Sequence, residues 1–334
     1  MNKIRSIDVE HSVSAQHVLI YPFPMHFSQG FTYHLSILQF LQALSQFIEV
    51  RLLCLDTRTE LAEFYEHEFH EPLADNFHVV TVSQKRWGIK SNRFWFYRNV
   101  IGEVERLSRR NVKVTIYSRN VKQMAQTLKY RANRSQQVRC LFECHQLYSQ
   151  NLACRGEFAG GLREFKLETR INTAADHVFV NTRPLAHQIK RLFDRMPTAL
   201  PVATRSQDLI DPAKAGNEYA SRPYDFVYAG SFGEWKGVDA LFEAFAILRH
   251  AGWAGRALCV GVREAERLEV ERNLKVSGAS HCVDLVGKVP RADVASYLDQ
   301  ARVGVLPNSL MEDSVFNTSP LKLYDYAARG LSIC

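Results

Sequence analysis

The chain has 334 residues, of which 46% are hydrophobic and 23% are charged, and it carries a formal net charge of +7. These values are ordinary for a soluble globular protein, and the length exceeds one hydrophobic core, so we expect two domains. No apolar run reaches the ~18 residues that a membrane-spanning helix needs. The first residues also lack the apolar segment of a signal peptide, which favours a cytoplasmic location.

The first half of the chain alternates strand-like apolar runs with amphipathic stretches. Leucines and an isoleucine at helical spacing over residues 35–44 predict a helix after the first strand. Alternation of this kind favours a parallel, doubly wound α/β sheet. The runs that we expect to form strands are 17–21, 50–55, 112–117, 139–144 and 177–181.

Polar and helix-breaking residues then gather between Thr204 and Pro223. We therefore predict an N-terminal domain over residues 1–203, a linker over 204–222 and a C-terminal domain over 223–334. Ligands of such Rossmann-like domains bind at the carboxyl ends of the strands, here in a cleft between the domains. The expected strands of the second domain are 224–228, 257–260, 283–286 and 303–306, and its expected helices are 237–250, 263–277, 291–300 and 320–329.

The seven cysteines are scattered and odd in number. This pattern suits reduced, buried thiols better than a disulfide framework. Cys140, Cys144, His145 and Cys154 form the one cluster worth testing as a metal site. Their spacing fits no common zinc pattern, so we expect no metal.

The positive net charge implies an anionic partner, for which a diphosphate donor, anionic lipid and nucleic acid are the candidates. Basic residues recur over 106–110 and around Lys129, Arg131 and Arg134, on expected helix surfaces. No nucleic-acid-binding motif accompanies them, so we expect no nucleic-acid partner. Attachment to a membrane surface fits better, and a solvated basic face is the alternative.

The last helix that we expect has a marked beginning and end. Ser319 suits the N-cap, Pro320 suits the first helical position and Gly330 ends the helix. Backbone amides at such an N-terminus attract phosphate, and Lys322 adds a positive charge there. Asp325 lies further along, within reach of a polar group attached to the phosphate. The alternative is an ordinary capped helix whose aspartate is solvated.

Several segments of the second half resemble bacterial glycosyltransferases of family 4, which have the GT-B architecture of two Rossmann-like domains facing a cleft. Residues 319–330 (SPLKLYDYAARG) resemble the family's "SPxKxxEYxAxG" block, and residues 228–239 (YAGSFGEWKGVD) resemble its "YxGSxxxWKGVD" segment. Residues 286–290 and 303–307 stand where the family has its "fxGxv" and "vxvlP" strands. The resemblance implies an acceptor-side first domain and a second domain that binds the nucleotide sugar.

Relatives of this type continue beyond the point where this sequence ends. Cys334 lies inside the expected fifth strand of the second domain. We therefore expect the second domain to be incomplete here. The chain is then either a fragment or a truncated product, or another chain covers the exposed apolar surface.

The resemblance also implies which residues hold the donor phosphates. Lys236, which follows the strand-end glycine Gly230, would contact the diphosphate; a loop lysine on the surface is the alternative. Ser231 stands where many relatives have arginine, so the site would be less cationic unless Lys322 or Lys288 compensates. Ser319, at the start of the last helix, is a further phosphate-binding candidate.

Two positions of the second domain correspond to the paired carboxylates of the family's E-x7-E element. Asp325 aligns with the second carboxylate, which holds the ribose hydroxyls. Asn317 stands at the first, where an amide can still bond sugar hydroxyls. Glu312 and Asp313 are acidic candidates on the preceding loop, and they are equally compatible with plain solvation.

In the first domain, similar enzymes place a histidine near the donor sugar at a strand end, where this chain has Glu143 and His145. A structural role for this histidine is the alternative. Gly30 stands where relatives carry a glycine pair that lets the backbone approach the donor. Arg119 is a candidate contact for an anionic acceptor or phosphate, and a helix-capping ion pair is its alternative. Two further acceptor-side candidates flank the first loop: His26 and His34.

The resulting expectation is a retaining, metal-independent glycosyltransferase without a cofactor. It would move a sugar from a nucleoside diphosphate sugar to a glycan or lipid-linked acceptor in surface polysaccharide synthesis, in the cytoplasm or at the inner membrane face. One alternative is a sugar-nucleotide epimerase of the same fold, which would need no acceptor. The other is a non-catalytic remnant or binding module, which Ser231 and Asn317 would suit.

Overall fold

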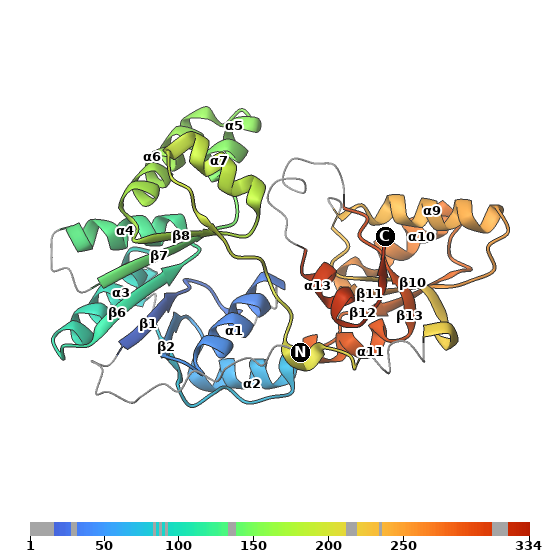
Figure 1. The fold of residues 1–334 in the computed structure, drawn as a ribbon, viewed down its shortest axis with the longest axis horizontal. Coiled ribbons are helices and arrows are strands. Elements are labelled where there is room, and N and C mark those ends of the chain that lie inside the picture. Colours follow the sequence, from blue (N-terminus) through green and yellow to red (C-terminus); the bar gives the residue numbers. More distant parts are fainter. Residues whose placement is uncertain are drawn as a thin grey trace, which may run out of the picture.

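The computed structural model describes residues 17–27, 32–82, 85–86, 89–90, 93–132, 138–211, 219–233, 236–308 and 320–334. These residues form two α/β domains, each built on a parallel sheet, with a stretch of chain running between them (Figure 1). The expected fold class, two Rossmann-like doubly wound domains, is therefore confirmed.

The first sheet has seven strands in the order β3-β2-β1-β6-β7-β8-β9, and every neighbouring pair is parallel. Side chains of β1 show how it is buried on both faces. Val18 and Ile20 belong to one hydrophobic cluster, whereas Leu19 and Tyr21 belong to another. Such strands read as continuous apolar runs, which is why the sequence predicts them well. The strands are β1 (His17–Pro22), β2 (Glu49–Cys54), β3 (Phe77–Thr81), β6 (Lys113–Ser118), β7 (Val138–Cys144), β8 (His177–Val180) and β9 (Thr198–Ala199).

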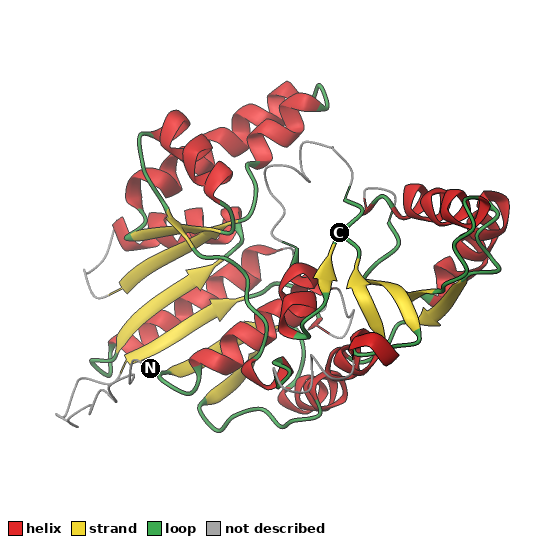
Figure 2. Ribbon diagram, turned by 45° about the vertical axis from the view of Figure 1, so that its right-hand side comes forward, coloured by secondary structure: helices red, strands yellow, loops and turns green. Residues whose placement is uncertain are grey.

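Helices cover both faces of this sheet, as Figures 1 and 2 show. A two-stranded antiparallel sheet, β4 (Lys85–Arg86) with β5 (Ile89–Lys90), stands apart from it. The helices are α1 (Thr32–Leu44), α2 (Arg58–Phe69), α3 (Arg93–Ser108), α4 (Val121–Ala132), α5 (Tyr148–Cys154), α6 (Phe158–Ala174) and α7 (Arg183–Phe193).

The second sheet has five parallel strands in the order β12-β11-β10-β13-β14. Here too the central strand is buried on both faces, because Val227 and Tyr228 of β10 belong to different clusters. The strands are β10 (Tyr224–Ala229), β11 (Ala257–Val262), β12 (Val283–Gly287), β13 (Ala301–Gly304) and β14 (Ser332–Ile333). The helices are α9 (Val238–His250), α10 (Arg267–Ser277), α11 (Val294–Leu298) and α13 (Leu321–Ala328).

The expected elements are confirmed with small shifts. The strand expected over 303–306 begins two residues earlier, because Ala301 already pairs with Tyr224 of the central strand. Pro320 is the N-cap of α13 rather than its first residue. Gly330 ends that helix with a φ of 66°, a left-handed value that glycine adopts readily. The expected N-cap Ser319 lies outside the described residues.

Five of the seven cysteines are buried, and Cys154 and Cys334 are exposed; none forms a disulfide. Within the described ranges, no group of three or more His, Cys, Asp or Glu side chains is arranged as metal ligands. No described helix combines the length and the apolar character that crossing a bilayer requires.

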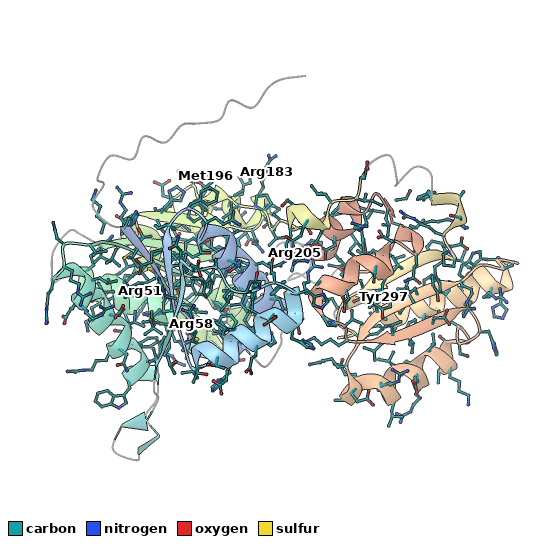
Figure 3. The ribbon with its side chains drawn as sticks, turned by 90° about the horizontal axis from the view of Figure 1, so that it is seen from below. Arg51, Arg58, Arg183, Met196, Arg205 and Tyr297 are labelled. Carbon is teal, nitrogen blue, oxygen red and sulfur yellow. The ribbon has the colours of Figure 1, made fainter. Side chains whose placement is uncertain are left out.

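The segment of chain that connects the two sheets makes hydrogen bonds to both domains. Arg205 lies where they meet (Figure 3), and its Nη1 donates to the Phe69 carbonyl at the end of α2 (3.4 Å). Beside it, the buried carboxylate of Glu68 accepts hydrogen bonds from Lys288 Nζ and from the Arg291 backbone N–H, both at 3.2 Å. Through Glu68, the first domain therefore binds the loop that follows β12.

Candidate functional site

The end of the central strand β10 carries the first part of the site. Gly230 directly follows β10, and its N–H donates to the Val260 carbonyl (2.9 Å). Its φ of 155° is one that side-chain-bearing residues rarely adopt. A Cβ built on Gly230 would lie 3.5 Å from Lys322 Nζ and 3.4 Å from Tyr228 Oη. Strand end, lysine and tyrosine therefore enclose one small region.

Lys322 is the most unusual residue of this region, because its side chain is turned inward from the first turn of α13. The residue is 7% exposed, and its ammonium lies 4.0 Å from the centre of the Tyr228 ring. Within the described part of the chain, Lys322 Nζ has no hydrogen-bond partner. Burial first, and then the charge of Lys236, lower its pKa to about 7. A buried cation without an anion is costly unless a ligand supplies the anion.

Lys236 supplies the second positive charge. It lies just before α9, and its backbone N–H donates to the Gly233 carbonyl (2.8 Å). Burial lowers its pKa to about 8. Because the charge of Lys236 disfavours the charged form of Lys322, an anion beside the two ammonium groups would favour both charges. The neighbouring Ser231 contributes its carbonyl, which accepts a hydrogen bond from the Tyr228 hydroxyl (2.5 Å).

Asp325 lies one turn further along α13, and its carboxylate is already engaged. Its Oδ1 accepts hydrogen bonds from Arg291 Nη2 (2.5 Å) and from the Thr204 hydroxyl (3.0 Å). A second carboxylate, Asp208, has its Oδ2 3.7 Å from the same Arg291 nitrogen. Burial raises the pKa of Asp325, and the arginine opposes this increase. A ligand hydroxyl that binds Asp325 would share the carboxylate with these partners or displace them.

A second cluster stands at the carboxyl ends of β6 and β7 in the first domain. The Glu143 carboxylate, 3% exposed, accepts from the Tyr117 hydroxyl (2.5 Å), Arg119 Nε (2.8 Å) and His145 Nε2 (2.6 Å). Burial alone raises the pKa of Glu143, but the hydrogen bonds and charges of His145 and Arg119 outweigh it and bring the pKa to about 2. The carboxylate is therefore ionised and holds the histidine by one ring nitrogen.

The arginine of this cluster also reaches the first helix, since Arg119 Nη1 donates to Ser36 Oγ (3.4 Å). The other two histidine candidates, His26 and His34, differ in exposure. His26 Nδ1 donates to Oδ1 of the buried Asp56 (3.2 Å). His34 is fully buried against the Phe27 carbonyl (3.3 Å), and burial lowers its pKa.

The structure thus brings together Gly230, Lys236 and Lys322, with Asp325 on the same helix, and separately Arg119, Glu143 and His145. Three candidates, Gly30, Asn317 and Ser319, lie outside the described residues, as do Glu312 and Asp313.

Sequence reasoning missed several partners of these residues. Tyr228, whose ring faces the Lys322 ammonium, is the first residue of the 228–239 segment, so the sequence could have indicated it as a site residue. The other partners carry no local signal, because their contacts are made across the fold. The missed residues are Glu68, Tyr117, Thr204, Asp208, Tyr228 and Arg291.

Comparison with known families gives the second domain its class. Residues 223–333 match a family model described as glycosyl transferases group 1. Over these residues the second domain is similar to group 1 glycosyltransferases. The expected enzyme class is thereby confirmed for this domain, which contains the lysine pair and Asp325. The narrower assignment to family 4 stays a prediction. No curated protein matches the chain by sequence alone.

Solved glycosyltransferase structures share the whole two-domain architecture. A sucrose-phosphate synthase from Thermosynechococcus elongatus superposes with a TM-score of 0.67 at 16% identity, covering 95% of this chain and 80% of the other. Anabaena HepE in complex with UDP gives 0.65 at 12% identity with the same coverage. WaaG, a glycosyltransferase involved in lipopolysaccharide biosynthesis, gives 0.60 at 14% identity, again covering 95% and 80%. At such identities the likeness establishes the GT-B fold.

Proposed function

We propose that the protein transfers a sugar from a nucleoside diphosphate sugar to a glycan or lipid-linked acceptor. The observation that carries this proposal is the buried Lys322, whose ammonium lies beside the strand-end glycine Gly230 and near enough to Lys236 to feel its charge. A diphosphate carries dense negative charge that would bind both ammonium groups. The group 1 domain supports the same reading.

In this proposal the lysines stabilise the leaving group. The bond between the anomeric carbon and the diphosphate oxygen breaks, and the acceptor oxygen bonds to that carbon from the same face, so the configuration is retained. The acceptor proton passes to the leaving phosphate, and neither metal nor cofactor takes part. Ammonium groups held in place before the reaction stabilise the developing charge better than water would.

The remaining residues orient the donor. Asp325 would hold the ribose hydroxyls after its bonds to Arg291 and Thr204 are exchanged, and Asn317 would face the sugar. His145 binds Glu143 through Nε2, which leaves Nδ1 as the ring atom for a sugar hydroxyl.

A uridine nucleotide is the first donor to test, because HepE structures contain UDP and UDP-glucose. Surface polysaccharide synthesis is the proposed setting, by analogy with WaaG. The sugar transfer would take place in the cytoplasm, at the inner membrane face where lipid-linked acceptors reside.

The first test is the thermal response to nucleotides. UDP should raise the melting temperature, and uridine should do so much less, because the lysines recognise the phosphates. Lys236→Ala should remove most of the gain, since one charge-assisted contact contributes about 1.5–3 kcal/mol. Lys275→Ala, an exposed lysine of α10, is the matched control and should respond like the wild type. An undiminished UDP response in Lys236→Ala would rule out the phosphate role.

Asp325 and Asn317 should differ in what they recognise, because they stand eight positions apart. Asp325→Ala should weaken binding of UDP and of its sugar conjugate alike, by about tenfold for one lost hydrogen bond to a charged group. Asn317→Ala should leave UDP binding unchanged and alter the preference among sugar conjugates. Isothermal titration with UDP and a panel of UDP-sugars measures both. Equal losses for every ligand in both variants would contradict this division.

Product analysis then separates transfer from the epimerase alternative. A transferase should release UDP only when an acceptor is present or water replaces it. Conversion of the UDP-sugar without any acceptor or glycosylated product would favour the epimerase.

A further inference from the structure

Helix α6 exposes an apolar stripe that a globular protein would normally bury. Phe158 is 72% exposed, Leu162 is 58% exposed and Phe165 is 36% exposed. Their spacing of four and three residues places them on one side of the helix. The buried side lies beside the stripe around the helix and includes Gly161, Glu168, Ile171 and Asn172. The stripe is therefore not the side that packs on the domain.

The stripe continues onto the end of the neighbouring helix α7. The rings of Phe165 and Phe193 lie 5.3 Å apart, and beyond them Leu192 is 38% and Met196 is 57% exposed. Figures 1 and 2 both show α5, α6 and α7 gathered at one end of the first domain. Met196 and Arg183 project from the outer edge of this domain in Figure 3. We call this surface, made by the exposed residues of 155–196, the α6–α7 face.

The α6–α7 face is strongly basic. Its exposed acidic residues are Glu157, Asp176 and Asp194, of which Asp194 pairs with Lys190 and Asp176 with Arg131 of α4. On α7 the apolar Leu185 and Ile189 are buried, so its basic residues point outward. The exposed basic residues of the face are Arg155, Arg163, Lys166, Arg170, Arg183, Lys190 and Arg191.

The basic patch expected from the sequence is different, because acidic neighbours compensate it. Arg106 bonds Glu103 through both Nε (2.8 Å) and Nη2 (2.5 Å). Arg109 lies 3.7 Å from Glu105. Arg106 and Arg109 therefore have acidic partners, as most basic residues of the α6–α7 face do not within the described part of the chain.

We infer that the α6–α7 face binds an anionic membrane surface, with the apolar stripe in the headgroup region and the lysines and arginines on lipid phosphates. An apolar stripe flanked by basic residues is what such a surface recognises. Each Lys or Arg near an anionic bilayer strengthens binding about fivefold. A second copy of the chain fits worse, because two such faces would oppose like charges. This docking would serve the lipid-linked acceptor of the proposed function, but it does not depend on catalysis.

Co-sedimentation of the full chain with vesicles tests the inference, with neither nucleotide nor acceptor present. The chain should bind vesicles containing phosphatidylglycerol and bind pure phosphatidylcholine weakly. Phe158→Ser with Leu162→Ser should abolish most binding, and Arg163→Gln with Lys166→Gln should weaken it about 25-fold, at fivefold per charge. Matched controls are Leu268→Ser, a 78% exposed leucine of α10, and Arg109→Gln with Arg110→Gln. Both controls should bind like the wild type.

A local probe keeps the test independent of folding. An environment-sensitive fluorophore on the exposed Cys154, in a Cys334→Ser background, should shift to the blue with anionic vesicles. The UDP-induced melting shift should be unchanged in the stripe variants, which separates this inference from the proposed function. Equal binding by stripe and control variants, or no fluorophore shift, would overturn it. Self-association that the stripe variants abolish, without vesicle binding, would instead assign the face to a second copy.

Discussion

Replacing Lys322 by methionine should stabilise the ligand-free protein and at the same time remove most of its response to UDP. Lys322 is 7% exposed, and its buried ammonium has no hydrogen-bond partner within the described residues. Methionine fills a similar volume without the charge, so the variant avoids an uncompensated buried cation. We expect a gain of about 1–3 kcal/mol in the free energy of unfolding at neutral pH.

Nucleotide binding should change in the opposite direction. Loss of one charge-assisted phosphate contact, about 1.5–3 kcal/mol, weakens UDP binding roughly 10- to 150-fold. Urea unfolding measures the first effect and isothermal titration the second. Lys275→Met, on the exposed side of α10, should change neither. A less stable Lys322→Met variant that binds UDP normally would show that this lysine is structural.

The lowered pKa values of the two lysines also predict the direction in which UDP affinity and stability change with pH. In the free protein Lys322 has a pKa of about 7 and Lys236 of about 8, and a bound diphosphate raises both. Binding therefore takes up protons above pH 7, and UDP affinity should fall as pH rises from 7 to 9. For stability, the penalty of the buried charge is complete below pH 7 and decreases as pH rises toward the unfolded value of 10.5. Titration in buffers of different ionisation enthalpy counts the protons.

Glu143→Gln should destabilise the first domain by about 3–5 kcal/mol, because it leaves a buried cation without its counterion. The Arg119 guanidinium donates to Glu143 Oε2 through Nε (2.8 Å), and both side chains are largely buried. Urea unfolding followed by circular dichroism measures the loss. Glu271→Gln, which removes an exposed ion pair with Arg267, is the control and should cost less than about 1 kcal/mol.

The charge on Glu143 also predicts how acid acts on the protein. Its pKa is about 2 when folded and near 4.5 when unfolded, so its stabilisation is complete above 4.5 and is lost as pH falls toward 2. Glu143→Gln should lack this part of the acid dependence. Adding Arg119→Met to Glu143→Gln should restore stability, since no buried charge remains. A double variant as unstable as the sum of both single variants would argue against a coupled pair.

Much of the fold is predictable from the sequence because parallel strands buried on both faces are continuous apolar runs. Val18 to Tyr21 and Val227 to Tyr228 are such runs, and the strands form there. The strand Phe77–Thr81 was missed because it is short, contains His78 and pairs with β2 alone. Such a strand is defined by its partner rather than by its own pattern.

The candidate site was predictable only in part, for reasons of charge and distance. Glu143 lies near the end of β7 and Arg119 directly follows the neighbouring parallel strand β6, so their meeting follows from the sheet order. The burial of Lys322 could not be predicted from the sequence, because a lysine in a first helical turn is usually solvated. The pairing of Arg291 with Asp325 joins positions 34 residues apart and depends on how β12 and α13 pack.

The buried Glu68 bears on how fast a product could leave. Its carboxylate accepts from the backbone N–H of Arg291, while the side chain of Arg291 donates to Asp325, so Arg291 links the first domain to Asp325. Parting of the two domains would transfer the Glu68 carboxylate from its two donors to water, and we expect this step to be slowest at low ionic strength. Glu68→Gln should then hasten dissociation of UDP more than it weakens UDP at equilibrium. The junction between the domains would then set the rate of UDP release and contribute little to the affinity for UDP.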